Sequence, residues 1–194
     1  MPDQIRTLLW FSEFSESSKW TNAKTMRTAM TIDETPQRPR PDLGRTPIEI
    51  IIEAIAFLAL GGIVVLIAAS WGSLPEQIPH HFDVAGRPDA WGGKWVLVVL
   101  AAISVVLYAM LSAFGRIPHR FNYLWPITAA NAPEQYRIAV SLLRILKTEA
   151  MFLFGFLTLR MIQSQGLGKG FVPILIATLG VTIFVHLVMA YLDR

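Results

Sequence analysis

The chain has 194 residues, of which 53% are hydrophobic and 16% are charged, and its formal net charge at pH 7 is +3. Soluble domains average about 25% charged residues, so this apolar, charge-poor composition excludes a chain that is disordered throughout. The absence of cysteine excludes disulfides, thiolate metal sites, iron–sulfur clusters and cysteine nucleophiles.

The first 48 residues form a polar segment. It contains charges of both signs and a proline-rich run at residues 36–41. Such a composition cannot bury enough apolar surface to offset the entropy of ordering the chain. We therefore predict a disordered cytoplasmic tail over residues 1–48, followed by one membrane domain over residues 49–194.

Four apolar segments follow the tail. Crossing a hydrocarbon core of about 30 Å takes about 20 helical residues, and segments 50–71, 95–114 and 171–192 meet this requirement almost without charges. The fourth segment, 139–162, is polar in its first half and apolar in its second. We predict that it belongs to one helix from Ala132 to Gln163, begun by a capping box of Asn131 and Glu134. The predicted fold class is all-α, a four-helix transmembrane bundle.

Basic residues near the predicted spans are distributed unequally between the two sides of the membrane. Nine lie on the side of the N-terminus and four on the other side: Arg38, Arg40, Arg45, Arg116, Arg120, Arg137, Arg144, Lys147 and Arg194, against Arg87, Lys94, Arg160 and Lys169. Cytoplasmic loops carry the excess of Lys and Arg. We therefore predict a multi-pass protein of the cytoplasmic membrane with both termini in the cytoplasm. Its partner is the lipid bilayer rather than nucleic acid, because the basic residues border the spans.

The loop between the first two spans, residues 71–94, is rich in proline and glycine. Each proline fixes its own φ and restricts the residue before it. We therefore expect a rigid extracytoplasmic cap with a turn at residues 86–89, and no floppy linker.

The same loop carries a recognisable pattern: Leu-Pro, Ile-Pro-x-His-Phe, Gly-x-Pro-Asp and Lys, formed by Pro75, Pro79, His81, Phe82, Asp83, Gly86, Pro88, Asp89 and Lys94. This pattern resembles a bacterial membrane domain of unknown function that also occurs in the N-terminal part of SdpI-type immunity proteins. Asp83 stands where that family usually has asparagine. The resemblance covers about residues 55–136 and implies that these nine residues structure the loop or bind a ligand. It implies no reaction, and the C-terminal module of SdpI-type proteins has no match here.

Three functions are compatible with this pattern. The leading hypothesis is a non-enzymatic protein, without catalytic residues or cofactor, that senses or resists a peptide or antibiotic arriving at the outer face. One alternative is a small membrane enzyme or metal-dependent factor, because His80, His81, Asp83 and Asp89 offer imidazole and carboxylate ligands. Another alternative is an accessory subunit of a larger membrane complex.

Two polar residues lie inside predicted spans, where burying an ionisable group is costly. Glu53 lies about one turn inside the first span, and we expect it to pair with Arg45 or with a basic residue of the loop 116–120. His186 lies toward the inner end of the last span, and we expect it to hydrogen-bond to a neighbouring helix.

Overall fold

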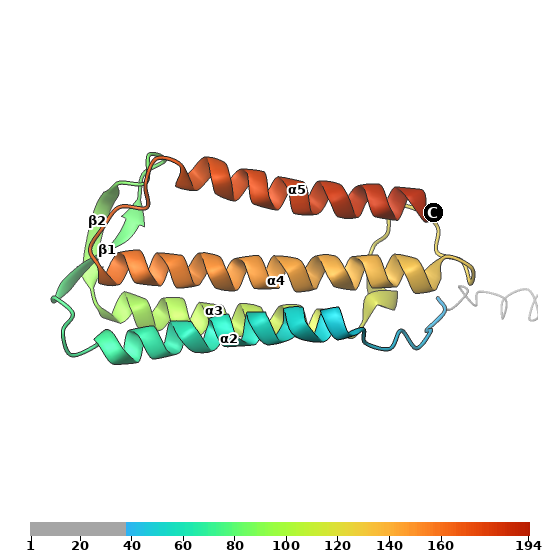
Figure 1. Ribbon diagram of the computed structural model, residues 1–194, viewed down its shortest axis with the longest axis horizontal. Coiled ribbons are helices and arrows are strands. Elements are labelled where there is room, and N and C mark those ends of the chain that lie inside the picture. The colour runs from blue at the N-terminus through green and yellow to red at the C-terminus, as the bar shows by residue number, and fades with distance from the viewer. Residues whose placement is uncertain (1–37) are drawn as a thin grey trace, which may run out of the picture. The chain divides into compact units, whose positions relative to one another are not determined.

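The structure is a computed structural model that describes residues 38–194. Residues 1–37, which make up most of the predicted disordered tail, lie outside the described residues. The described part contains four long helices, a single 3-10 turn and two strands (Figure 1): α2 (Pro47–Ser70), β1 (Gln77–Phe82), β2 (Pro88–Gly93), α3 (Trp95–Phe114), η1 (Pro118–Arg120), α4 (Ala132–Ile162) and α5 (Phe171–Leu192).

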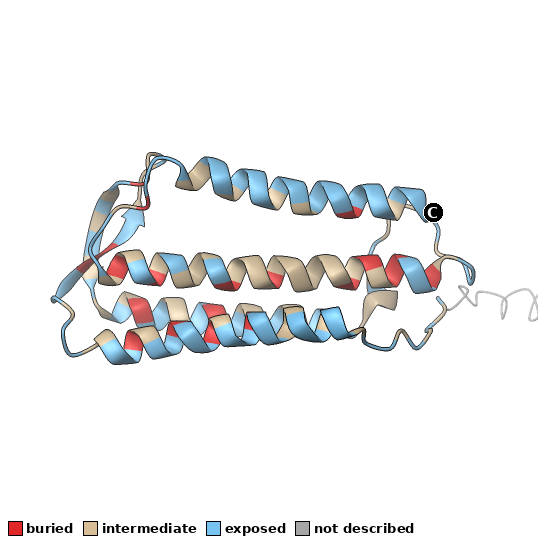
Figure 2. Ribbon diagram, viewed as in Figure 1, coloured by how far each residue is buried: buried red, intermediate tan, exposed pale blue. Residues whose placement is uncertain are grey.

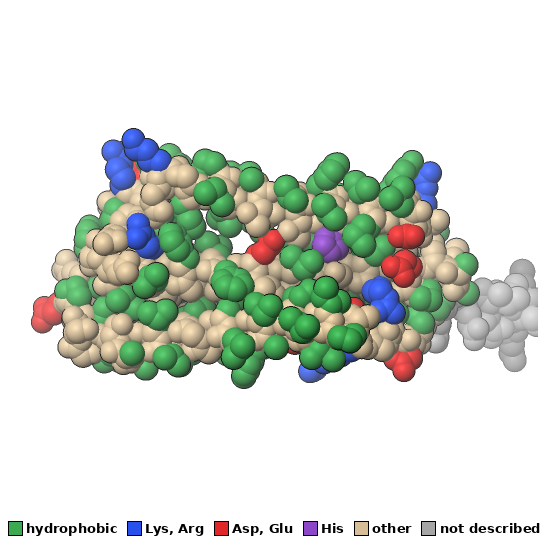
Figure 3. Space-filling model, viewed as in Figure 1, with side chains coloured by type: hydrophobic (Ala, Val, Ile, Leu, Met, Phe, Trp, Pro, Cys, Tyr) green, Lys and Arg blue, Asp and Glu red, His purple; other side chains and the backbone are tan. Residues whose placement is uncertain are grey.

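Three of these four helices, α2, α3 and α5, are long and apolar enough to cross a membrane. They confirm the predicted apolar segments to within three residues at each end. Hydrophobic side chains cover much of the helical surface in Figure 3. A water-soluble bundle keeps its apolar residues in a narrow stripe that faces a core, so this broad apolar surface is consistent with a membrane protein.

Helix α4 is the central element of the bundle. It has 31 residues, about 46 Å at 1.5 Å per residue, and its bounds confirm the predicted helix. It packs against α2, α3 and α5 and contains more buried residues than the other helices (Figure 2). Its buried residues include the polar Gln135, Lys147 and Thr158. The central position of α4 thus lets it carry more polar side chains than any of the other three helices.

The predicted capping box at the start of α4 is wrong. The Asn131 side chain makes no cap hydrogen bond to the helix. Its Oδ1 instead accepts the Thr128 N–H at 2.8 Å, and its Nδ2 donates to the Pro126 carbonyl at 3.1 Å. A capping box does begin α2, where Thr46 and Glu49 bond each other's backbone N–H groups. That box sets the start of α2 at Pro47.

The prediction of an all-α fold missed one element, a β-hairpin between α2 and α3. Strands β1 and β2 pair antiparallel, and Ile78 lies opposite Gly92. Register shifts on both sides of His81 leave His80 and Asp89 without a partner in the opposite strand. Bulges of this kind bend a strand and redirect its side chains. We call the end of the bundle that carries this hairpin the hairpin end, and the end where α2 begins the terminal end.

A compact core joins the hairpin to the helices. Ile78 of β1 is fully buried in a cluster with Ile63 and Ile67 of α2, Leu97 of α3 and Met161 of α4. Burying one such side chain contributes about 1.5–3 kcal/mol. The hairpin is therefore anchored on the bundle as a rigid cap, as the prolines of the loop predict.

Helix α5 packs mainly against α4. Most of its surface is exposed (Figure 2), and His186 is its single buried residue. An apolar helix with so little protein contact is suited to a lipid environment.

Candidate functional site

The tip of the hairpin is organised by Asp83. Its Oδ1 accepts the backbone N–H groups of Ala85 and Arg87 at 2.9 and 2.8 Å, and its Oδ2 binds the Arg87 guanidinium at 2.9 Å. The hydrogen bond from the Arg87 backbone and the charge of its guanidinium hold the pKa of Asp83 below the ordinary 3.8. Gly86 completes the turn at a φ of +74°, a conformation that glycine adopts without steric cost. The turn thus lies at residues 83–87, slightly before the predicted position.

The hairpin tip contacts the loop that joins α4 to α5. The Leu167 N–H donates to the Gly86 carbonyl at 2.6 Å, and Arg160 holds the same loop through the Gly166 carbonyl at 2.8 Å. A Cβ atom on Gly86 would lie 2.7 Å from the Gly168 oxygen. Two segments about 80 residues apart in the sequence therefore form one surface at the hairpin end.

The four candidate metal ligands do not converge on one point. His81 Nδ1 lies 2.5 Å from Asp89 Oδ1, and both side chains are largely exposed. Asp83 is engaged by Arg87, and the His80 ring lies beside Gly92. Among residues 38–194, no group of three His, Asp or Glu side chains is placed to hold a metal ion.

Under the hairpin lies a cavity of about 370 Å³. His80, His81, Phe82 and Asp83 contribute to its lining from the hairpin side. The remainder of the lining is apolar and comes from α3, α4, α5 and the α4–α5 loop: Val96, Val99, Leu100, Ile103, Leu157, Met161, Leu167, Phe171 and Val172. Such a combination of a few polar groups with apolar walls is typical of sites that bind small molecules.

The remaining residues of the loop pattern also lie in the cap. Pro79 is fully buried, and Phe82 packs against the core that anchors the hairpin. Pro88 begins β2, and Pro75 is exposed between α2 and β1. The Lys94 ammonium lies over the Trp71 ring, 5.1 Å from its centroid. The nine residues of the pattern thus fall on one structural unit, the hairpin with its two connections to α2 and α3.

Glu53 makes a partly buried ion pair, but with a residue that the sequence did not indicate. Its carboxylate lies 2.5 Å from Lys147 Nζ on α4, and the Lys147 side chain is only 2% exposed. Tyr108 donates to Glu53 at 3.0 Å, and Lys147 donates to Ser112 at 2.8 Å. The expected partners, Arg45 and the loop 116–120, are therefore wrong. One turn earlier, Glu49 pairs with Arg144 at 2.8 Å.

His186 hydrogen-bonds to a neighbouring helix, as the sequence predicts. Its Nε2 lies 3.3 Å from the Ser141 hydroxyl on α4, and its Nδ1 lies 2.8 Å from the Thr182 carbonyl of its own helix. The Thr182 hydroxyl donates to Glu149 of α4 at 2.6 Å. Sequence reasoning did not single out Glu149 as a site. The signal available was its position at the border of the apolar run 150–159.

Comparisons with known proteins give matches for only part of the chain. Residues 57–105, from α2 through the hairpin into α3, match Domain of unknown function (DUF1648). An uncharacterized protein of Archaeoglobus fulgidus is 30% identical over 73 residues, which is 38% of this chain and 37% of that protein. The match thus spans well under half of that relative's length. No solved structure matches the chain. These matches support a membrane domain of unknown function that contains the hairpin and its flanking helices, and show no link to SdpI-type proteins.

Proposed function

We propose that this chain is a four-span protein of the cytoplasmic membrane with both termini in the cytoplasm and the hairpin end outside. Three spans correspond to α2, α3 and α5, and the apolar half of α4 supplies the fourth. The excess of basic residues at the terminal end supports this orientation. An even number of spans also places both termini on one side.

The proposed function is binding of an amphipathic molecule at the outer face, either to sense it or to resist it. The proposed ligand is a peptide or antibiotic that partitions into the outer leaflet of the membrane. The observation that carries this proposal is the cavity under the hairpin, because polar side chains at its rim adjoin apolar walls from three helices. A ligand there would place polar groups near His80, His81 and Asp83 and its apolar part between α3 and α5. No chemical step is required, so we propose a binding protein and not an enzyme.

The test uses two matched tryptophan substitutions on α3. Ile103 lines the cavity, whereas Val106 is exposed on the same helix and does not line it. A strain without this gene is expected to become more sensitive to at least one secreted peptide or envelope-directed antibiotic. The wild-type gene and V106W should restore resistance, whereas I103W should not, because its indole fills the cavity.

Two results would overturn the proposal. One is a deletion strain with unchanged sensitivity across the panel. The other is an I103W variant that protects as well as the wild type at equal abundance in the membrane.

A further inference from the structure

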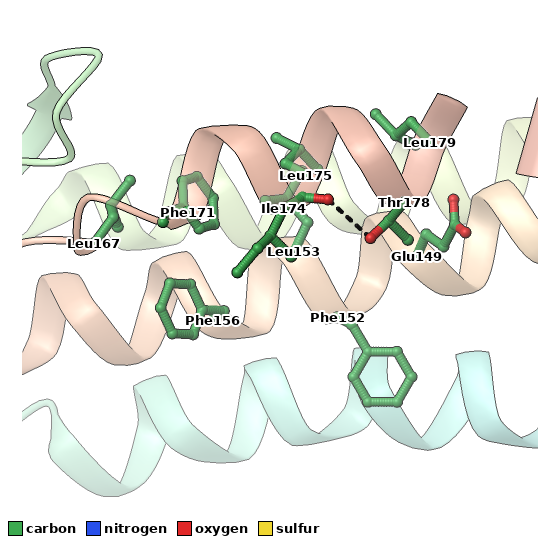
Figure 4. A pocket seen from close by; sticks show the side chains of 11 residues that line it. Glu149, Phe152, Leu153, Phe156, Leu167, Phe171, Ile174, Leu175, Thr178 and Leu179 are labelled. Carbon is green, nitrogen blue, oxygen red and sulfur yellow. Dashed lines mark hydrogen bonds between the residues drawn. The ribbon is translucent and has the colours of Figure 1, made fainter. Parts of the chain in front are cut away.

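A second cavity lies between α4 and α5 and adjoins the outer site, with which it shares Leu167 and Phe171. Its volume is about 600 Å³, and its lining is almost entirely apolar. Figure 4 shows its lining, with Phe152 and Phe156 on α4 and Phe171, Ile174 and Leu175 on α5. The Phe156 and Phe171 rings are stacked, with centroids 5.4 Å apart. We call this cavity the α4–α5 groove.

Glu149 is the single charged residue among the described residues that line the groove. One carboxylate oxygen, Oε1, accepts the Thr182 hydroxyl at 2.6 Å. The other oxygen, Oε2, is buried and has no hydrogen-bond partner within the described part of the chain. Unlike Glu53, which has Lys147, Glu149 therefore has no cation paired with it among those residues.

Glu149 also lies deep in the proposed membrane. Its partner Thr182 is near the middle of α5 (Phe171–Leu192), so the carboxylate is about 15 Å from either membrane surface. An ionisable side chain at this depth is costly and commonly marks a binding site or pathway. A phospholipid headgroup stays at the membrane surface and does not reach this level.

We propose that the α4–α5 groove binds a cationic amphiphile, a molecule with an apolar aromatic or alkyl body and one positive charge. The body would lie against Phe152, Phe156 and Phe171, and the cation would lie at the end of the groove that Glu149 lines. Charge complementarity selects this occupant, because a neutral or anionic molecule of the same shape would leave the carboxylate unpaired. The Arg160 guanidinium lies over the Phe156 ring, 5.7 Å from its centroid, and Phe156 is seven residues beyond Glu149, about 10 Å along α4.

The probe is tetraphenylphosphonium, and tetraphenylborate has nearly the same shape with the opposite charge. Equilibrium dialysis of the full chain in nanodiscs, with empty nanodiscs subtracted, gives the affinity for each ion. We expect the wild type to bind the phosphonium more tightly than the borate. Glu149→Gln should weaken phosphonium binding by about tenfold or more, because it removes the one opposite charge from an apolar groove of low dielectric constant. Glu134→Gln, on the exposed first turn of the same helix, should leave binding unchanged.

Leu175→Trp provides a second variant, which keeps Glu149 and fills the groove. It tests the proposal if Glu149→Gln does not fold. It should also weaken phosphonium binding. Val106→Trp, on an exposed part of α3 that lines neither cavity, should leave phosphonium binding unchanged. The proposal is overturned if the borate binds as well as the phosphonium. It is also overturned if Glu149→Gln folds and retains the wild-type affinity for the phosphonium. If Glu149→Gln does not fold, wild-type affinity of Leu175→Trp overturns it.

Discussion

At the tip of the hairpin, the Asp83 carboxylate accepts two backbone N–H groups and binds the Arg87 guanidinium. All of these contacts favour the charged carboxylate, which is why its pKa lies below the ordinary 3.8. A carboxyl group whose pKa falls on folding stabilises the fold above its unfolded pKa, and this stabilisation is lost as pH falls through the folded pKa. The turn is thus built to stay ordered across the neutral and mildly acidic range.

We predict that the hairpin tip is unchanged from neutral pH down to about pH 4 and loosens only under more acidic conditions. The measurement is a carboxyl chemical-shift titration of Asp83, followed together with hydrogen exchange at the Arg87 amide. Asp83→Asn keeps an oxygen that accepts the backbone N–H groups but loses the charge, so it should show no acidic transition. A titration of Asp83 at or above 3.8 would contradict this account.

The Glu53–Lys147 pair gives a prediction of a different kind. The Lys147 side chain is buried, whereas that of Glu53 is 32% exposed. Removing one partner leaves an uncompensated charge and costs at most about 3 kcal/mol, since solvent screens the carboxylate, whereas replacing both by apolar residues is often neutral. We therefore expect Glu53→Leu and Lys147→Met each to lower the unfolding temperature in detergent. The double variant Glu53→Leu/Lys147→Met should unfold closer to the wild type than either single variant does. A double variant that loses the sum of the two single effects would show that the residues are not coupled.

At the scale of elements, the hairpin and the α4–α5 loop meet through glycines. Gly86 is buried, has a positive φ, and has no room for a Cβ against the Gly168 backbone. Helix α2 offers a matched control, because a Cβ on Gly62 meets nothing within 4 Å.

Gly86→Ala should therefore separate the hairpin from the α4–α5 loop at a cost of about 1–3 kcal/mol, whereas Gly62→Ala should cost nothing. Hydrogen exchange at the Leu167 amide, which donates to the Gly86 carbonyl, reports the contact directly. Unchanged protection of that amide in Gly86→Ala would mean that the two loops do not depend on each other.

The elements also show what the sequence can predict. Helices α2, α3 and α5 were predictable because an apolar run of about 20 residues indicates a spanning helix by itself, whatever the rest of the chain does. The hairpin was not, because the β1 segment 77–82 contains Pro79 and two adjacent histidines in place of alternating residues, and its register is broken by bulges. The predicted cap of α4 was wrong because the Asn131 side chain accepts the Thr128 N–H, in the preceding loop, instead of an N–H of the helix.

The same limit applies to the candidate sites. The loop pattern located the nine residues of the cap, since they lie close together in the sequence. The partner of Glu53 is 94 residues away, and the cavity under the hairpin combines three helices with a strand. Such contacts follow from packing, and a single sequence offers no local pattern that indicates them.

On the scale of the whole molecule, the proposed outer site requires four membrane crossings with the hairpin outside. Helix α4 differs from the other three because its charged first half keeps it out of the set of plainly apolar helices. The loop between α4 and α5 and the hairpin tip must lie on the same side of the membrane, since they touch. The segment between α3 and α4 must lie on the other side.

The chain contains no cysteine, so single cysteines can map these positions without background labelling. Val84 at the hairpin tip is 88% exposed and Leu124 at the terminal end is 72% exposed, and Lys169 is exposed in the α4–α5 loop. In intact cells, a membrane-impermeant maleimide should label Val84→Cys and Lys169→Cys, and should label Leu124→Cys only after permeabilisation. Labelling of Leu124→Cys in intact cells, or protection of either of the other two, would contradict the four-span topology and the outer site that depends on it.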